Sequence, residues 1–312
     1  MNIENVIIIG GGPAGLAAAI YTARANVKPL LFAGSPSGGQ LMLTSEVENY
    51  PGFDSILGPE LVLKMKAQAE KFGTRVIEEN VLKVNFTQRP FKVYSSLQNY
   101  IEANTVLIAT GAKALWLGLE SETRLRAKGI SACATCDGFF FRNKVVGVVG
   151  GGDTAMEEAL TLAKSSTKVY VIHRKDAFRA SKIMQDRVLS HPQIEVLWNT
   201  QVIEVLGENK VEGVKLQVGV QEKTVSVDGL FIAIGHKPDT NLFKEQIALD
   251  EEGYVVTSSQ RTLSSLYPSM TSVEGVFAAG DCVDHVYRQA ATAVGMGVAA
   301  ALEIERFLQL NV

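Results

Sequence analysis

Residues 6–15 read VIIIGGGPAG, a short apolar run that ends in a cluster of glycines. The β-branched run predicts a strand that is buried on both faces, as in a parallel sheet. Residues 13–25 are rich in alanine and predict a helix, and residues 28–32 predict a second strand. Together they predict a β-α-β unit of about 30 residues. Its glycines satisfy the pattern G-x-G-x-x-G, in which free N–H groups at a helix N-terminus hold the pyrophosphate of a dinucleotide.

The same arrangement occurs a second time, which predicts two nucleotide-binding domains of related fold. Residues 144–149 predict a strand, residues 150–155 read GGGDTA, residues 153–163 predict a helix and residues 168–172 a further strand. Alanine is tolerated at the last position of the pattern, because that position needs only close packing of helix on strand. An ordinary tight turn is the alternative interpretation of each glycine cluster, but the flanking strand and helix favour dinucleotide binding.

The two units differ at the position, about 20 residues past the glycines, that contacts the ribose of a dinucleotide. The first unit has Ala33 there, and the second has His173, followed by Arg174, Lys175 and Arg179. Arginine pairs with phosphate oxygens through two parallel hydrogen bonds. The basic cluster therefore favours the 2′-phosphate of NADPH, with a solvated charged loop as the alternative. The first unit lacks a ribose acid, so its residues alone do not identify the dinucleotide.

Two of the three cysteines, Cys133 and Cys136, are separated by two residues, and Asp137 follows directly. Such a pair is a zinc half-site, a redox disulfide or a coincidence. Zinc needs three or four protein ligands, and no histidine pair stands at ligand spacing, so no metal site is expected. The spacing suits a redox disulfide, in which the Asp137 carboxyl exchanges a proton or caps a helix. Cys282, without a partner in the sequence, is expected to be a small buried hydrophobic residue.

Composition and charge argue against several classes of protein. The net charge is −3, so the basic face of a nucleic-acid binder is not indicated. The apolar stretches 6–20 and 290–302 are too short to span a membrane. The first residues lack the basic region of a signal peptide, and three cysteines do not make the framework of a secreted disulfide-rich domain. We therefore expect a cytoplasmic protein with no membrane or nucleic-acid partner.

Two glycine fingerprints with the segment ACATCDGFF, residues 132–140, between them resemble the low-molecular-weight thioredoxin reductases. The resemblance covers essentially the whole chain. It includes GGQL at 38–41, EVEN at 46–49, HRK at 173–175 and YRQA at 287–290. The cysteine segment is highly specific, whereas the glycine turns alone are not.

The resemblance implies an α/β fold of two Rossmann-like, three-layer dinucleotide-binding domains, the second inserted into the first. Residues 1–113 and 246–312 would form the FAD-binding domain, and residues 114–245 the NADPH-binding domain that carries the redox disulfide. The residues implied at FAD are Gly10, Gly12, Pro13, Ala14, Gly15, Ala33, Gly34, Gly39, Gln40, Asn49, Val81, Gly111, Gly280, Asp281, Arg288, Gln289 and Ala290. Those implied at NADPH are Gly150, Gly152, Asp153, Thr154, His173, Arg174, Lys175, Arg179 and Ile234.

The activity implied by the resemblance is NADPH-dependent reduction of thioredoxin through FAD and the cysteine pair. In the family, Cys136 is the sulfur nearer the flavin, Asp137 protonates the departing thiolate, and Cys133 attacks the disulfide of the partner. One domain rotates against the other between the two half-reactions. The family usually carries an arginine where Lys175 stands. Lysine lacks the planar fork of arginine, so the preference for NADPH would be softer.

Phe139 and Phe140 follow the pair, and two adjacent aromatic side chains cannot both face one core. The resemblance implies that they help to dock thioredoxin, with Lys128 supplying a charge, and that the protein is a homodimer. Three alternatives are a flavin reductase that serves a peroxidase system or another thioredoxin-fold partner, a flavoprotein that reduces ferredoxin or flavodoxin, and a non-catalytic nucleotide sensor. The first relatives carry an extra N-terminal domain, the second lack the cysteine pair, and a Cys-x-x-C beside an acid disfavours the third.

Overall fold

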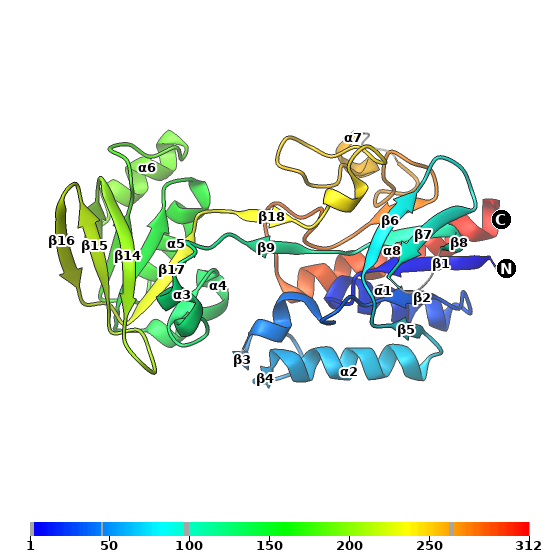
Figure 1. The fold of residues 1–312 in the computed structure, drawn as a ribbon, viewed down its shortest axis with the longest axis horizontal. Coiled ribbons are helices and arrows are strands. Elements are labelled where there is room, and N and C mark those ends of the chain that lie inside the picture. Colours follow the sequence, from blue (N-terminus) through cyan, green and yellow to red (C-terminus); the bar gives the residue numbers. More distant parts are fainter. Residues whose placement is uncertain (1–2, 45, 97–99, 262–264, 312) are drawn as a thin grey trace. The chain divides into compact units, whose positions relative to one another are not determined.

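A computed structural model describes residues 3–44, 46–96, 100–261 and 265–311. The chain forms two compact units, and the second is inserted into the first (Figure 1). The first unit comprises Met1–Lys113 and Lys237–Val312, and the second comprises Ala114–His236.

A seven-stranded sheet forms the centre of the first unit. Its strands are β1 (Glu4–Ile9), β2 (Leu30–Phe32), β5 (Arg75–Ile77), β6 (Val81–Asn85), β7 (Phe91–Ser95), β8 (Ile101–Ile108) and β19 (Val276–Ala278). Their order is β5-β2-β1-β8-β7-β6, with β19 also paired to β8. Strands β5, β2, β1, β8 and β19 run parallel, whereas β7 and β6 add antiparallel pairs beside β8. The parallel centre confirms the strand type expected from the apolar run.

The apolar run of β1 is buried on both faces, as predicted. Val6 and Ile8 belong to one hydrophobic core, and Ile7 and Ile9 belong to a second core, because successive side chains of a strand point to opposite faces. Three helices supply the first core (Figure 1). They are α1 (Pro13–Arg24), α2 (Gly58–Lys71) and α8 (Ala290–Asn311). Helix α1 packs against both α2 and α8, so the helix that begins at the glycine turn is held firmly.

Short elements complete the first unit. They are the 3-10 helices η1 (Gly39–Leu43) and η3 (Asn241–Phe243), the strands β3 (Glu46–Val47) and β4 (Ile56–Leu57), and the helix α7 (Ser258–Arg261). The chain returns to this unit at Lys237, whereas the sequence suggested residue 246. The reason lies in Phe243, which is fully buried in the second core and stacks against Phe86 at a centroid distance of 6.3 Å. Residues 237–245 thus carry part of the core of the first unit.

The second unit is built around a five-stranded parallel sheet. Its strands are β10 (Ile130–Ser131), β11 (Val145–Gly150), β12 (Lys168–Ile172), β13 (Ile194–Leu197) and β17 (Gly229–Ala233), in the order β10-β17-β11-β12-β13. Its helices are α3 (Glu120–Leu125), α4 (Ala134–Asp137), η2 (Gly138–Phe141), α5 (Asp153–Ala163) and α6 (Lys182–Leu189). An antiparallel sheet consists of β14 (Thr200–Leu206), β15 (Gly213–Val218) and β16 (Gln221–Val225).

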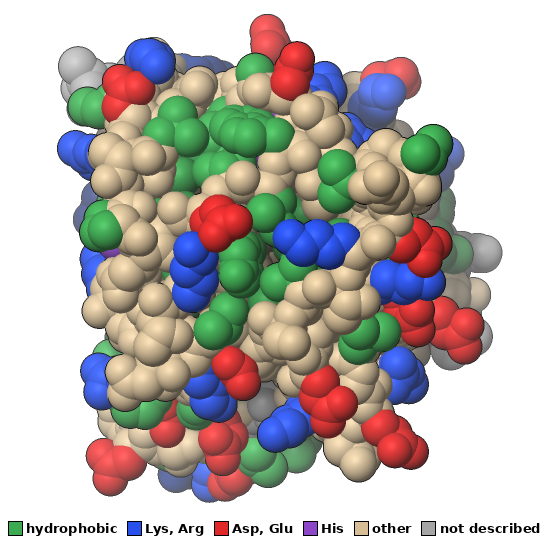
Figure 2. Space-filling view, turned by 90° about the vertical axis from the view of Figure 1, so that its left-hand side faces the viewer, with side chains coloured by type: hydrophobic (Ala, Val, Ile, Leu, Met, Phe, Trp, Pro, Cys, Tyr) green, Lys and Arg blue, Asp and Glu red, His purple; other side chains and the backbone are tan. Residues whose placement is uncertain are grey.

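Two cores cover the two faces of this parallel sheet. In β17, Phe231 joins the core formed with α5 and α6, whereas Leu230 and Ile232 join the core formed with β14 and β15. The unit therefore has three layers, with α5 and α6 on one face of the parallel sheet and the antiparallel sheet, joined by Leu125 of α3, on the other. The face shown in Figure 2 carries interspersed basic and acidic side chains among apolar patches.

The two segments that connect the units are hydrogen-bonded to each other as a two-stranded sheet. They are β9 (Ala112–Ala114) and β18 (His236–Pro238). The expected α/β fold, with parallel strands at the centre of each of two units, is confirmed. No helix within the described residues is long and apolar enough to cross a membrane.

Candidate active site

Cys133 and Cys136 form a disulfide, with their Cα atoms 5.3 Å apart. Cys133 stands just before α4 with an extended backbone, and its Sγ accepts a hydrogen bond from the N–H of Cys136 at 3.2 Å. The N–H of Cys133 donates to Oγ of Ser131 at 3.0 Å. The cysteine pair thus spans the first turn of a short helix, whose N–H groups favour negative charge on a sulfur.

Asp137 ends α4 and is mostly buried. Burial raises the pKa of the Asp137 carboxyl above its usual value, and a hydrogen bond with Ser131 offsets part of that effect. The carboxyl therefore keeps its proton to higher pH than an exposed aspartate does. An acid that holds its proton more tightly than usual, one residue from Cys136, is suited to supply a proton to a thiolate.

Cys282 is fully buried, and its Sγ lies 3.3 Å from the carbonyl oxygen of Ala279. Burial raises the pKa of its thiol to about 12. Because the thiolate is the reactive form, this cysteine is inert at neutral pH. It behaves as the small buried residue that the sequence predicted.

The first glycine turn leaves the N-terminus of α1 open. Gly10 has a φ of +120°, and a Cβ there would lie 2.1 Å from the carbonyl oxygen of Ala109, so glycine is required. Gly12 directly precedes α1, and no side chain caps the helix there. A Cβ built on Gly12 would have no other atom within 4 Å. A Cβ built on Gly39, the first residue of η1, would lie 3.7 Å from Cα of Gly12. The start of α1 is therefore open at Gly12 and lies close to the backbone of η1, which fits a dinucleotide.

Distant segments of the first unit meet at this turn. A Cβ on Gly280 would lie 2.8 Å from Cβ of Ala14, so the chain after β19 runs directly against the start of α1. Nδ2 of Asn49 donates to Oε1 of Gln289 at 3.3 Å. The structure therefore brings together several residues predicted at FAD that are far apart in sequence. Ala33 and Gly34 follow β2, Gln40 lies in η1, Val81 begins β6, and Gly111 has a φ of +73° just before β9.

Asp281 follows Gly280, and burial raises the pKa of its carboxyl to about 6. The charge of Asp284 adds to this shift, and the charge of Arg288 opposes it. The sequence reasoning missed the role of Asp284, whose carboxylate accepts hydrogen bonds from the N–H groups of three following residues at 2.8–2.9 Å. An aspartate that opens a turn is a known signal for such bonds.

His285 anchors the loop that carries Arg288 and Gln289. Its Nε2 lies 3.0 Å from Oδ2 of Asp250, and its ring stacks on Tyr254 at a centroid distance of 4.0 Å. Arg288 donates to the carbonyl oxygen of His285 at 2.6 Å. These bonds fix the loop that leads into α8.

The second glycine turn precedes α5. Gly152 is the residue before this helix, has no side-chain cap, and faces open space within 4 Å. Gly151 is crowded, because a Cβ there would lie 2.1 Å from the ring of His173. That ring is buried, bonds the carbonyl oxygen of Ala177 at 3.0 Å, and packs on Phe178. His173, predicted at NADPH, thus packs its ring directly against the backbone of the glycine turn.

The basic loop 174–181 is tied to the same turn. The N–H groups of Arg179 and Ala180 donate to the carbonyl oxygen of Gly151 at 2.8 and 3.2 Å. Oδ1 of Asp153 accepts hydrogen bonds from N and Oγ of Ser181 at 2.9 and 2.7 Å. Arg174, Lys175 and Arg179 are exposed. The structure therefore places a positively charged, accessible loop beside the open start of α5, which fits a phosphorylated dinucleotide. Thr154 lies in α5, and Ile234 follows β17.

Phe139 and Phe140 lie in η2 with 58% and 37% of their surface exposed. Their rings meet edge to face at a centroid distance of 6.2 Å, and the guanidinium of Arg142 lies 4.4 Å from the ring centre of Phe139. Lys128 is exposed in the loop before β10. The expected exposure of an aromatic side chain after the cysteine pair is confirmed.

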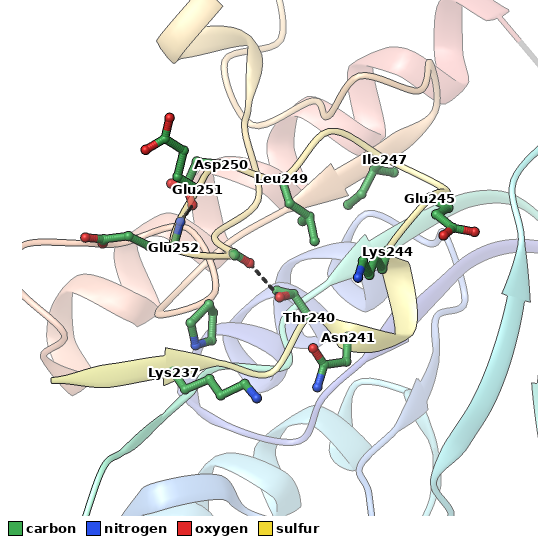
Figure 3. A pocket seen from close by; sticks show the side chains of 12 residues that line it. Lys237, Thr240, Asn241, Lys244, Glu245, Ile247, Leu249, Asp250, Glu251 and Glu252 are labelled. Carbon is green, nitrogen blue, oxygen red and sulfur yellow. Dashed lines mark hydrogen bonds between the residues drawn. The ribbon is translucent and has the colours of Figure 1, made fainter.

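A cavity of about 460 Å³ lies elsewhere in the first unit, between η3 and the loop 247–253 (Figure 3). Thr240 and Gly253 both line it, and Oγ1 of Thr240 donates to the carbonyl oxygen of Gly253 at 2.6 Å. Residues predicted at either dinucleotide do not line it. Within the described residues, no group of three or more His, Cys, Asp or Glu side chains is arranged to hold a metal ion.

Comparison with known proteins places these features in one class. Residues 4–297 match the family of pyridine nucleotide-disulphide oxidoreductases, and the chain belongs to that family. Among curated proteins, it is 52% identical to a thioredoxin reductase of Rickettsia felis over 310 residues, with 97% of both chains covered. It is 49% identical to a thioredoxin reductase of Streptomyces clavuligerus, with 98% of this chain and 94% of the other covered.

Two of the solved structures to which the chain is similar are also thioredoxin reductases. The thioredoxin reductase of Giardia duodenalis is 41% identical and superposes with a TM-score of 0.93 over 99% of this chain and 100% of the other. That of Streptococcus pyogenes is 38% identical, with a TM-score of 0.91 over 99% of each chain. The resemblance that the cysteine segment predicted is therefore confirmed.

Proposed function

We propose that this protein is a thioredoxin reductase, which uses NADPH and a flavin to reduce Cys133–Cys136 and then passes the electrons to thioredoxin. The observation that carries the proposal is the disulfide on α4, in the same unit as a glycine turn and an accessible basic loop. The thioredoxin reductases to which the chain is about 50% identical support the same activity.

We assign FAD to the first unit and NADPH to the second. The cradle of Gly10, Gly12 and Gly39 would hold the pyrophosphate of FAD, with Asp281 and the Asn49–Gln289 pair beside it. Gly152 and the start of α5 would hold the pyrophosphate of NADPH. Arg174, Lys175 and Arg179 would pair with its 2′-phosphate, because they are exposed and their loop is bonded to the glycine turn.

A bound flavin supplies a two-electron carrier between the nicotinamide and the disulfide. Two electrons and two protons break the Cys133–Cys136 bond and leave two thiols. Cys136 would be the sulfur nearer the flavin, and Asp137, whose pKa is raised by burial, would donate its proton to the departing thiolate. The Cys133 thiolate then attacks the disulfide of thioredoxin and forms a mixed disulfide. Cys136 attacks Cys133, which restores the internal disulfide and releases reduced thioredoxin.

The exposed pair Phe139 and Phe140, next to the reactive cysteines, would form the apolar centre of the thioredoxin contact. Lys128 would add a charge at its edge. Replacing Phe139 with serine is expected to raise the KM for thioredoxin about tenfold, with the reaction of NADPH and the flavin unchanged.

We also propose, from the resemblance, that the chain forms a homodimer.

The purified protein tests the function directly. We expect the absorption of a bound flavin, NADPH-driven reduction of thioredoxin, and a much slower reaction with NADH. Cys133→Ser should abolish thioredoxin reduction while flavin reduction by NADPH continues. Thioredoxin turnover that survives Cys133→Ser would contradict the proposal. So would a protein that reduces thioredoxin with NADH but not with NADPH.

A further inference from the structure

Glu158 contacts the segment that carries the redox cysteines. Its Oε1 accepts a hydrogen bond from the backbone N–H of Ala134 at 3.3 Å. Ala134 follows Cys133 directly and is the first residue of α4. Glu158 belongs to α5, the helix that packs against both α4 and η2. A carboxylate from a neighbouring helix is therefore held at the turn where the chain enters α4.

The packing of α4 on α5 keeps this contact in place. Ala134 is buried in the core that contains Ala159 and Leu162 of α5. Leu162 also approaches η2, because a Cβ built on Gly138 would lie 3.3 Å from its side chain. Glu158 and Leu162 are four residues apart and so share one face of the helix. That face of α5 supports the cysteine helix at both of its ends.

The N–H groups at the start of α4 are divided between a sulfur and a carboxylate. The N–H of Cys136 donates to Sγ of Cys133, and the N–H of Ala134 donates to Glu158. N–H groups at a helix N-terminus stabilise a thiolate there. A carboxylate beside the same turn has the opposite effect, because a second negative charge nearby is unfavourable.

Within the described residues, the other acidic side chains on α4 and on the elements packed against it, η2 and α5, are Asp137, Asp153 and Glu157. Asp137 lies on α4 itself, and η2 contains no ionisable side chain. On α5, Asp153 bonds Ser181, and Glu157 is exposed. Glu158 is thus the ionisable group that a packed neighbouring element directs to the start of α4.

We propose that Glu158 is a positioning residue that disfavours the Cys133 thiolate and thereby makes the reduced cysteine pair a stronger reductant. A dithiol whose reduced form is stabilised is a weaker reductant, as a lower reduction potential requires a less stable reduced state. The carboxylate acts on the reduced state, since the disulfide carries no charge. The inference rests on the proposed function, in which Cys133 attacks the partner.

The first test measures the Cys133 thiol alone. The holoenzyme variant Cys136→Ser is alkylated with iodoacetamide over a range of pH, with and without the second change Glu158→Gln. We expect the titration midpoint of the alkylation rate to fall by about 1 pH unit in Glu158→Gln. The rate at neutral pH should rise about threefold, because a more acidic thiolate is also less nucleophilic. Glu157→Gln removes the same charge one residue away, on an exposed position, and should leave the midpoint unchanged.

The second test measures the intact pair by redox equilibrium with glutathione, scored by alkylation and mass so that the flavin does not contribute. At a fixed glutathione ratio, Glu158→Gln should be reduced to a greater extent than the unchanged protein. Glu158→Asp keeps the charge and should lie between the two, which provides a second variant if Glu158→Gln folds poorly. Equal midpoints and equal redox equilibria in all of these proteins would overturn the inference. Neither measurement uses thioredoxin, so failure of the proposed function, seen as absent thioredoxin turnover, is a separate result.

Discussion

The carboxylate of Asp153 binds Ser181 twice, through the backbone N at 2.9 Å and through Oγ at 2.7 Å. These bonds lower the pKa of the Asp153 carboxyl and join the end of the basic loop to the first turn of α5. The relationship gives Asp153 a structural role, because its two bonds fasten the end of the basic loop to the helix that begins at the glycine turn. It leads to a prediction about the strength of NADPH binding.

Replacing Ser181 with alanine removes the hydroxyl bond and loosens the loop that carries Arg174, Lys175 and Arg179. We expect the KM for NADPH to rise about fivefold, in line with roughly 1 kcal/mol for one exposed hydrogen bond to a charged group. The kcat should stay unchanged. Ser190→Ala, at the end of α6 in the same unit, is the matched control. An equal effect in both variants would show that the bond between Asp153 and Ser181 has no part in NADPH binding.

The two neighbouring glycines of the second turn should respond differently to alanine. Gly151→Ala places a methyl group 2.1 Å from the buried ring of His173, so we expect the protein to lose about 1–3 kcal/mol of stability. Gly152→Ala meets no atom within 4 Å and has a φ of −98°, which alanine adopts freely. Thermal unfolding should therefore leave Gly152→Ala near the original Tm, while its KM for NADPH rises because the methyl group enters the phosphate groove. Equal Tm values for the two variants would argue against the packing of His173 on this turn.

Asp137 is expected to act in its protonated form, and burial raises its pKa. A reaction that needs the protonated carboxyl falls off as the pH rises through that pKa, so the raised value extends activity to higher pH than an exposed aspartate would allow. Asp137→Asn should lower thioredoxin turnover about 100-fold with the disulfide still formed. The measurement is the pH profile of kcat, with Asp186→Asn on the surface of α6 as the control. A profile that keeps its alkaline limb in Asp137→Asn would assign that limb to another group.

Asp281 carries a cost in stability that depends on pH. Its pKa is raised from 3.8 to about 6, so the folded protein binds a proton more tightly than the unfolded chain. Stability relative to Asp281→Asn is therefore greatest below about pH 4 and declines as the pH rises to about 6, by roughly 3 kcal/mol. Urea unfolding of the flavin-free protein at a series of pH values measures the difference. A difference between the two proteins that rises with pH would contradict the direction of the shift.

The local patterns of the chain were sufficient for much of the fold. The run before Gly10 predicted a strand buried on both faces, and β1 is such a strand. The helix expected over residues 13–25 is α1, Pro13–Arg24. The return of the chain to the first unit at Lys237, where residue 246 was expected, could not be predicted, because the burial of Phe243 depends on Phe86, a residue far away in the chain.

The sequence by itself determined the chemistry of this protein, because two glycine turns and the segment Cys133–Asp137 each depend on residues that are neighbours in the chain. The tertiary structure alone decided what surrounds that chemistry. It packs Gly280 against Ala14, packs the ring of His173 against Gly151, and places Glu158 at the start of α4. Such contacts join residues from different elements, so they follow from how helices and strands pack and not from the spacing of residues along the chain.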